Sequence, residues 1–114
     1  MKPIVILESP YSSAFPELAR RNQRYARACL LDALYRGEAP MASHLLYTLV
    51  LDDSNPIERE LGMDAGFGFY PMASICAVYT DLGMSDGMRK GVEHAKKHGL
   101  PIEMRKVPEW DGRD

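Results

Sequence analysis

Residues 77–103, AVYTDLGMSDGMRKGVEHAKKHGLPIE, carry the clearest secondary-structure pattern in the sequence. An apolar, β-prone run over 75–79 predicts a strand, and residues 80–87 follow it with turn and helix-cap chemistry. Residues 89–98 have helical composition, and Pro101 then opens a second strand-like run. The stretch therefore predicts a βαβ unit. In such a unit the turn after the first strand lies at the carboxyl edge of a parallel sheet, where ligands bind.

The start of the chain predicts a second unit of the same kind. Residues 3–7 (PIVIL) form a continuous apolar run, which is typical of a strand covered on both faces. A polar turn over 8–13 follows, with Ser12 or Ser13 available to cap the next helix. That helix is expected to begin at Pro16 and to end near Gly37, because its apolar residues recur every three or four positions.

The middle of the chain is less regular. Residues 38–43 favour a brief edge strand, either before Pro40 or around Met41. The apolar run 44–51 fits a strand or a helix, and we favour a helix because a serine precedes it and an acidic loop follows it. A further helix is expected from Pro56 to Leu61, and residues 62–70 then form a flexible, glycine-rich aromatic segment.

These elements predict one α/β domain over residues 1–108, followed by a flexible tail over 109–114 in which Trp110 can dock. The expected architecture is a small three-layer Rossmann-like (flavodoxin-like) fold with a four-stranded parallel sheet in the order 2-1-3-4. Strands 1 and 3 would then be neighbours whose crossovers leave in opposite directions. Ligands are expected in the cleft between the 8–13 and 81–88 turns.

Composition narrows the function classes. The chain has 114 residues, 46% of them hydrophobic, and a net charge of −2, which argues against nucleic acid or an anionic membrane as a general partner. The longest apolar run is too short to span a bilayer, so we expect a cytoplasmic protein. Cys29 and Cys76 are expected to be core residues, and the three histidines lack zinc-site spacing, so neither a metal nor a cofactor is expected.

The two turns contain the candidate site residues. The carboxylates of Glu8 and Asp81 each end a strand at the cleft and are the candidate catalytic groups. Ser85, with the amides of Gly87 and Met88, suits a phosphate at a helix N-terminus, although a capping role alone also explains it. The expected ligand-binding residues are Ser9, Tyr11, Asn22, His44, Asp81, Gly83, Ser85, Gly87 and Met88.

Four segments resemble the nucleoside 2-deoxyribosyltransferase-like superfamily: VILESPYSS, NQRYARACLLDAL, GEAPMASHLLYT and VYTDLGMSDGMRKGVEHAKKHGLPIE. This superfamily includes deoxynucleoside 5′-monophosphate N-glycosidases and many small uncharacterised phage and prophage proteins, which the chain resembles most. The resemblance implies a nucleotide-shaped cleft, an origin in a phage or prophage with location in the bacterial host cytoplasm, and a homodimer, for which residues 62–70 are the candidate contact.

The resemblance also identifies one departure. In the characterised enzymes the third turn reads Ser-x-Gly-x-x-x-Glu, in which the serine and glycine amides hold the phosphate and the glutamate attacks the anomeric carbon. Ser85 and Gly87 match the first two positions, but the glutamate position falls on Gly91, which has no side chain to act as a nucleophile. Glu8 is the candidate for a displaced carboxylate.

Three functional hypotheses follow. The first is a protein that binds a nucleotide or nucleoside-like ligand without catalysis, for instance to sequester a nucleotide signal of the ADP-ribose type. The second is an active N-glycosidase or deoxyribosyltransferase that uses Glu8 or Asp81. The third is a protein–protein interaction module with an idle cleft.

Overall fold

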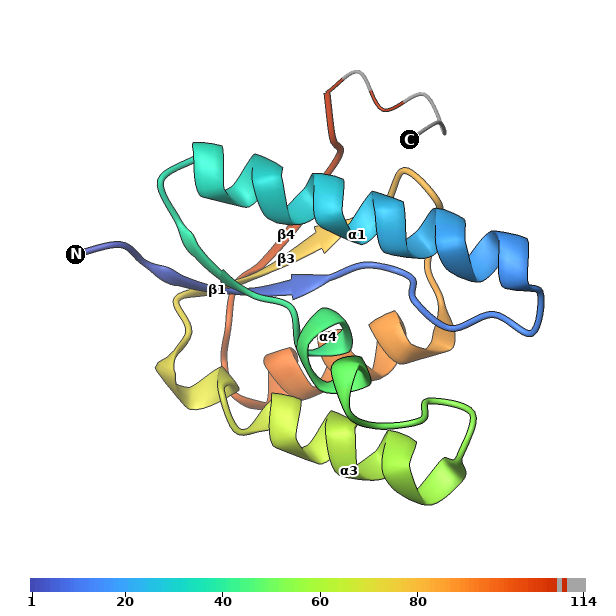
Figure 1. Ribbon diagram of the computed structural model, residues 1–114. Helices are drawn as coiled ribbons and strands as arrows, with labels where there is room; N and C mark the ends of the chain where they lie inside the picture. Colours follow the sequence, from blue (N-terminus) through green and yellow to red (C-terminus); the bar gives the residue numbers. More distant parts are fainter. Residues whose placement is uncertain (109, 111–114) are drawn as a thin grey trace.

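The computed structural model describes residues 1–108 and 110, and the described chain forms a four-stranded, all-parallel sheet between layers of helices (Figure 1). The strands run in the order β2-β1-β3-β4, as predicted from the sequence. They are β1 (Ile4–Glu8), β2 (Ala39–Met41), β3 (Ile75–Tyr79) and β4 (Ile102–Arg105). The two central strands pair in register from Val5–Ile75 to Glu8–Val78, so their carboxyl ends lie side by side. The arrangement is that of a small Rossmann-like domain.

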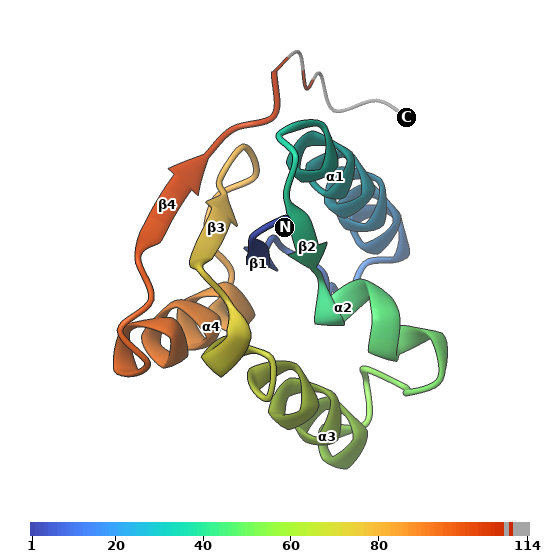
Figure 2. The same cartoon turned by 90° about the vertical axis from the view of Figure 1, so that its left-hand side faces the viewer.

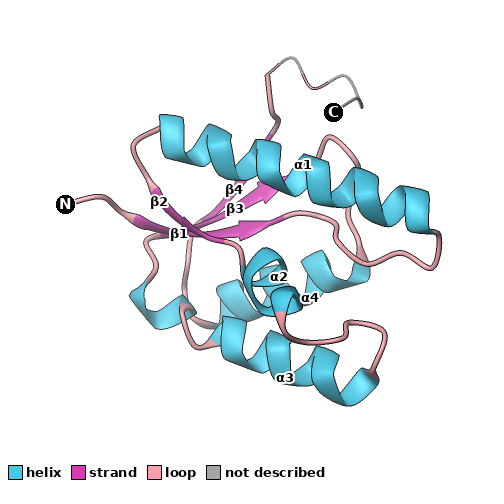
Figure 3. Ribbon diagram, in the orientation of Figure 1, coloured by secondary structure: helices cyan, strands magenta, loops and turns pink. Residues whose placement is uncertain are grey.

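Helices cover both faces of the sheet (Figures 2 and 3). Among the described helices, the long helix α1 (Pro16–Tyr35) is the one that covers the first face. The opposite face carries α4 (Asp86–Lys97), with α3 (Pro56–Phe67) and the single turn α2 (Ser43–Leu46) further out. Two 3-10 turns, η1 (Tyr47–Leu49) and η2 (Tyr70–Met72), complete the second layer.

The strands divide the core into two halves by simple alternation of side chains. One half packs β1 and β3 residues against α1, and the other packs the alternate residues against α4. The α1 half contains Val5, Leu7, Ala77 and Tyr79 together with Tyr25, Cys29 and Ala33. The α4 half contains Ile6, Cys76 and Val78 together with Tyr70, Met88 and Ala95. Both cysteines are buried and free, as predicted.

Three details differ from the sequence-based expectations. Helix α3 continues past Leu61 to Phe67, so residues 62–67 of the segment expected to be flexible are helical; Gly66 packs closely on α2, where a β-carbon would lie 2.5 Å from Ser43 Oγ. The 44–51 run is helical only as far as Leu49, split between the single turn α2 and the 3-10 turn η1, and residues 50 and 51 lie outside both. The N-cap of α1 is Phe15, not Ser12 or Ser13.

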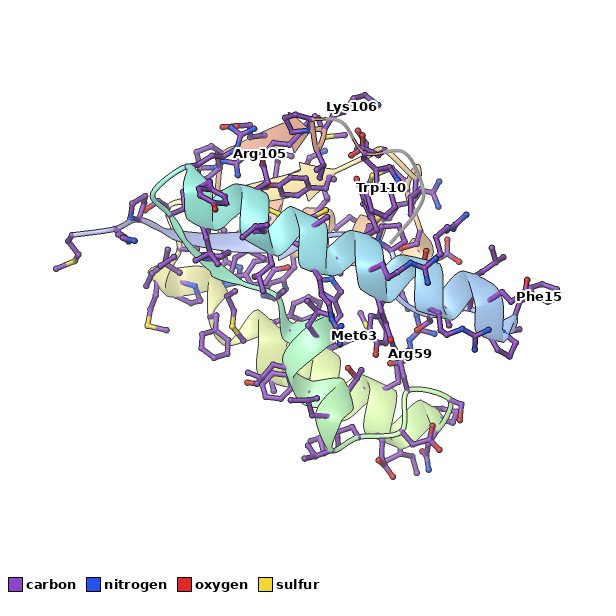
Figure 4. All side chains as sticks on the ribbon, turned by 45° about the horizontal axis from the view of Figure 1, so that its top comes forward. Phe15, Arg59, Met63, Arg105, Lys106 and Trp110 are labelled. Carbon is purple, nitrogen blue, oxygen red and sulfur yellow. The ribbon has the colours of Figure 1, made fainter. Side chains whose placement is uncertain are left out.

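A buried ion pair between Arg105 and Glu38 links the end of β4 to the residue before β2. Arg105, which is labelled in Figure 4, lies at the end of β4. It donates two hydrogen bonds to the Glu38 carboxylate at 2.8 and 2.6 Å and a third to the Tyr79 hydroxyl at 3.2 Å.

Trp110 packs edge-on against Tyr25, with the ring centroids 5.0 Å apart. Residues 109 and 111–114 of the expected tail lie outside the described residues. No described helix combines the length and apolar character needed to cross a membrane.

Candidate functional site

A cavity of about 670 Å³ opens at the carboxyl edge of the two central strands. Its walls come from the end of β1 and the loop after it, from α2, from the inner side of α3 and from the first turns of α4. The cavity lies between the 8–13 turn and residues 85–88, whereas residues 81–84 of the predicted second turn do not line it and α2 and α3 form much of its wall. Of the predicted ligand-binding residues, the cavity is lined by Ser9, Tyr11, His44, Ser85, Gly87 and Met88, and the candidate catalytic residue Glu8 lines it too.

Glu8 is the acidic group at the base of this cavity. As the last residue of β1 it follows Ile6 onto the α4 side of the sheet, where its Oε2 accepts a hydrogen bond of 2.7 Å from the Tyr70 hydroxyl. Burial raises the pKa of Glu8 from its ordinary 4.5 to about 7, and the hydrogen bond from Tyr70 opposes that rise. Near neutral pH this carboxyl is therefore present in both its protonated and its ionised form, which suits a group that exchanges protons.

Gly91 leaves the space in which the Glu8 carboxylate sits. A β-carbon at this position of α4 would overlap Glu8 Oε2 and would lie 2.8 Å from Oε1. Any side chain at residue 91 would thus displace the carboxylate. The absence of a side chain at Gly91 on α4 therefore makes room for the carboxylate that β1 supplies.

Ser9 and His44 form a second polar pair in the cavity. Ser9 Oγ lies 2.8 Å from His44 Nε2, and the Tyr11 ring stands edge-on to the imidazole with centroids 5.8 Å apart. Burial lowers the pKa of His44 to about 4, while the charge of Asp53 opposes that shift. The imidazole is accordingly neutral at physiological pH and can accept a proton.

The amino end of α4 provides the part of the cavity suited to an anion. Ser85 caps the helix by accepting a hydrogen bond of 3.2 Å from the Met88 amide, so the predicted capping role is confirmed. The Arg59 guanidinium lies close to the same turn: a β-carbon added to Gly87 would be 3.9 Å from Arg59 Nη2. Figure 4 shows Arg59 and Met63 projecting from α3 toward α1. A helix N-terminus beside an arginine favours phosphate or carboxylate.

Asp81, Gly83 and Asn22 do not line this cavity. Asp81 lies on the α1 side of the sheet, where its Oδ2 accepts hydrogen bonds from the Tyr25 hydroxyl at 2.5 Å and from the Val107 amide at 2.9 Å. It continues the alternation of Tyr79, whereas Glu8 continues that of Ile6.

Asn22 and Gly83 have local structural roles. Asn22 donates to the Tyr11 carbonyl at 3.2 Å and so supports the loop after β1. Gly83 makes its turn with a positive φ of 85°. The catalytic and ligand-binding roles expected for Asp81, and the ligand-binding roles expected for Asn22 and Gly83, therefore have no support from the geometry.

Sequence reasoning missed the residues that α3 and η2 bring to the cavity. Arg59, Met63, Phe67 and Tyr70 all line it. The aromatic run 67–70 was a usable signal, although only Phe67 and Tyr70 of its three aromatic residues line the cavity. Nothing local distinguishes Arg59 from any other arginine on a helix. Among the described residues there is also no cluster of three or more His, Cys, Asp or Glu side chains placed to hold a metal ion.

Residues 3–105 match the family described as Domain of unknown function (DUF7768). The chain belongs to this family. A search of the curated proteins finds no match to the chain. The DUF7768 domain extends here from β1 to the end of β4, and it includes Glu8, Gly91, the Ser9–His44 pair and Arg59.

Proposed function

We propose that the DUF7768 domain of this chain binds a nucleotide or nucleoside-like ligand in the cavity. The observation that carries the proposal is the pairing of the capped α4 N-terminus with the Arg59 guanidinium on one side of the cavity and the Glu8 carboxyl on another. The first side suits the phosphate, because helix amides and a guanidinium both donate to phosphate oxygens. The second suits a sugar hydroxyl, which can donate to a carboxylate or accept from a carboxylic acid.

The remaining wall of the cavity suits the nucleobase of the ligand. Tyr11 and His44 give it two flat rings, and the neutral imidazole adds no charge that would oppose an uncharged heterocycle. The volume of about 670 Å³ is within the range of small-molecule sites. The resemblance to the nucleoside 2-deoxyribosyltransferase-like superfamily supports the same class of ligand. Under this proposal the protein can sequester a nucleotide signal without acting on it.

Calorimetry with a panel of nucleoside monophosphates, diphosphates and ADP-ribose tests the proposal, together with mass spectrometry of any small molecule that copurifies. R59Q is expected to weaken phosphate-bearing ligands by about 1.5–3 kcal/mol, the range for a hydrogen bond to a charged group, with less effect on the matching nucleosides. R27Q is the matched control, because Arg27 is exposed on α1 and does not line the cavity. If no panel member binds and nothing copurifies, the proposal is wrong.

A second candidate function is cleavage of the N-glycosidic bond, and the Glu8–Gly91 arrangement favours it. In the ionised form, a Glu8 oxygen would bond to the anomeric carbon as the carbon–nitrogen bond breaks and the electron pair leaves with the base. Water or a second nucleobase would then attack the anomeric carbon, break its bond to Glu8 and release the sugar from the protein. The raised pKa of Glu8 fits a carboxyl that must change its protonation state near neutral pH.

Release of free base from a nucleotide panel, followed by chromatography, tests this second function. E8Q removes the nucleophile with little change in shape and is expected to abolish release while leaving binding in place. D81N is expected to retain activity, since Asp81 lies on the α1 side of the sheet. Release that survives E8Q would exclude Glu8 as the nucleophile.

The homodimer, the phage or prophage origin and the cytoplasmic location remain proposals that rest on the resemblance. The dimer contact expected over residues 62–70 also stays a proposal: Gly66 and Tyr70 are buried within the subunit, and Asp64, Ala65 and Gly68 are exposed. Light scattering on the purified protein measures the oligomeric state directly. A monomer at micromolar concentration would contradict the expected dimer.

A further inference from the structure

The Ser9–His44 pair has chemistry that neither nucleotide binding nor attack by Glu8 requires. The two residues are 35 positions apart in the sequence, and the fold brings Ser9 Oγ within 2.8 Å of His44 Nε2. Both line the cavity, so a bound molecule can reach the serine. A hydroxyl held against an imidazole is the arrangement by which proteins activate serine as a nucleophile.

We propose that Ser9 and His44 are a nucleophile–base pair that transfers the acyl group of a small carboxylic ester. Ser9 Oγ forms a bond to the carbonyl carbon while its proton passes to His44 Nε2. The bond from that carbon to the leaving oxygen then breaks, and the leaving oxygen takes the proton from His44. A water molecule repeats the sequence on the acyl-serine and releases the carboxylic acid, so atoms and charge balance.

The surroundings of the imidazole fit this role. Burial keeps His44 neutral at physiological pH, so in the tautomer that carries hydrogen on Nδ1 the Nε2 lone pair faces Ser9 Oγ at 2.8 Å, although the same burial makes the imidazole a weaker base than in water. Asp53, which also lines the cavity, favours the imidazolium that forms for a moment. Tyr11 packs edge-on against the ring and restricts its orientation. Arg59 is the one arginine among the described residues that line the cavity, and its guanidinium can stabilise the negative charge that develops on the carbonyl oxygen of the substrate.

Neighbouring serines lack these features. Ser12 donates to the Asp53 carboxylate, which does not activate it for attack in the same way, and Ser13 Oγ accepts from the Phe15 amide. Ser85 is engaged in capping α4. Ser9 lines the cavity but is only 5% exposed as a residue, so only a small part of it is open to a bound molecule or to solvent. The proposal therefore concerns Ser9 and small electrophiles.

Incubation with p-nitrophenyl acetate tests the pair, with nitrophenolate release and intact-protein mass as the two measurements. Wild type is expected to gain one acetyl group, which peptide mapping locates on Ser9. S9A is expected to lose this adduct, and H44Q is expected to slow its formation by about 10² or more, the effect of removing a general base. S74A is the matched control, because Ser74 lies at the opposite edge of the sheet, where its amide bonds to Ile4.

The pH profile separates activation from a structural role. Acylation of Ser9 should rise through pH 4, near the pKa of His44, and should then stay level to about pH 8. Adducts that form equally in S9A, or none in wild type, would overturn the proposal. Melting temperatures of S9A and H44Q verify that each variant is folded. Nucleotide binding measured on the same samples keeps this outcome distinct from that of the proposed function.

Discussion

The carboxylate of Glu8 occupies the space that a side chain at Gly91 would need. A β-carbon at residue 91 would lie 2.5 Å from Glu8 Cδ, closer than non-bonded carbon atoms approach one another. Tyr70 holds the carboxylate from the other direction with a hydrogen bond of 2.7 Å. One end of the cavity therefore depends on the absence of a side chain on α4.

G91A is expected to destabilise the wild-type protein by about 1–3 kcal/mol, because the new methyl group forces the Glu8 side chain to move in a packed site. In an E8A background the same change should stabilise by up to about 1 kcal/mol, since alanine is the better helix residue. Urea unfolding of the four proteins of this cycle measures the coupling. Equal effects of G91A in both backgrounds would contradict the proposed contact.

E8Q is expected to alter how stability depends on pH. The pKa of Glu8 is raised from 4.5 to about 7 in the folded protein, so the folded state favours the neutral carboxyl. Stability of the wild type is then full below about pH 4.5 and falls as pH rises toward 7, by at most about 3 kcal/mol at 1.36 kcal/mol per pKa unit. E8Q lacks this loss. Unfolding free energies measured across that window should diverge, and a constant difference between the two proteins would refute the assignment.

Y70F removes the hydrogen bond that favours the ionised form of Glu8. The pKa of Glu8 should therefore rise above about 7 in this variant, because burial is then less opposed. Titration of the Glu8 side-chain carbonyl by NMR measures the shift directly. A pKa that falls or stays constant would show that Tyr70 does not stabilise the carboxylate.

D81N is expected to affect stability and not the cavity. The Asp81 carboxylate links α1 to the segment after β4 by accepting from Tyr25 and Val107, so the amide should cost about 1–3 kcal/mol. Ligand affinity by calorimetry should stay within twofold of the wild type. A large loss of affinity with unchanged melting temperature would show that Asp81 takes part in ligand binding.

R105M is expected to destabilise strongly. The Arg105 side chain is 3% exposed and its partner Glu38 13% exposed, so removing the guanidinium leaves a largely buried carboxylate without its ion pair. Breaking such a pair costs about 3–5 kcal/mol. The double variant E38Q/R105M should recover part of that loss, and thermal unfolding of both proteins measures it. No recovery would mean that the cost arises from packing alone.

Much of the fold was predictable because its determinants are local. Apolar runs predicted β1 and β3, a short run beside Pro40 predicted the edge strand β2, and Pro101 marked the start of β4; proline, glycine and the cap Ser85 predicted several helix ends. The rule that crossovers are right-handed then gave the strand order. The helix at 44–51 and the length of α3 were harder, since a glycine against Ser43 is favourable only when the neighbouring helix is present.

Local patterns were enough to predict the sheet, the edge at which the cavity opens and several of its lining residues, because strand periodicity and turn chemistry act over a few residues. Tertiary packing sets which helix covers Glu8 and which covers Asp81, brings Ser9 to His44, and places Arg59 of α3 at the cavity. These relationships join residues tens of positions apart, such as the Tyr70–Glu8 bond across 62 positions. They depend on how helices pack on the sheet, which no local pattern specifies.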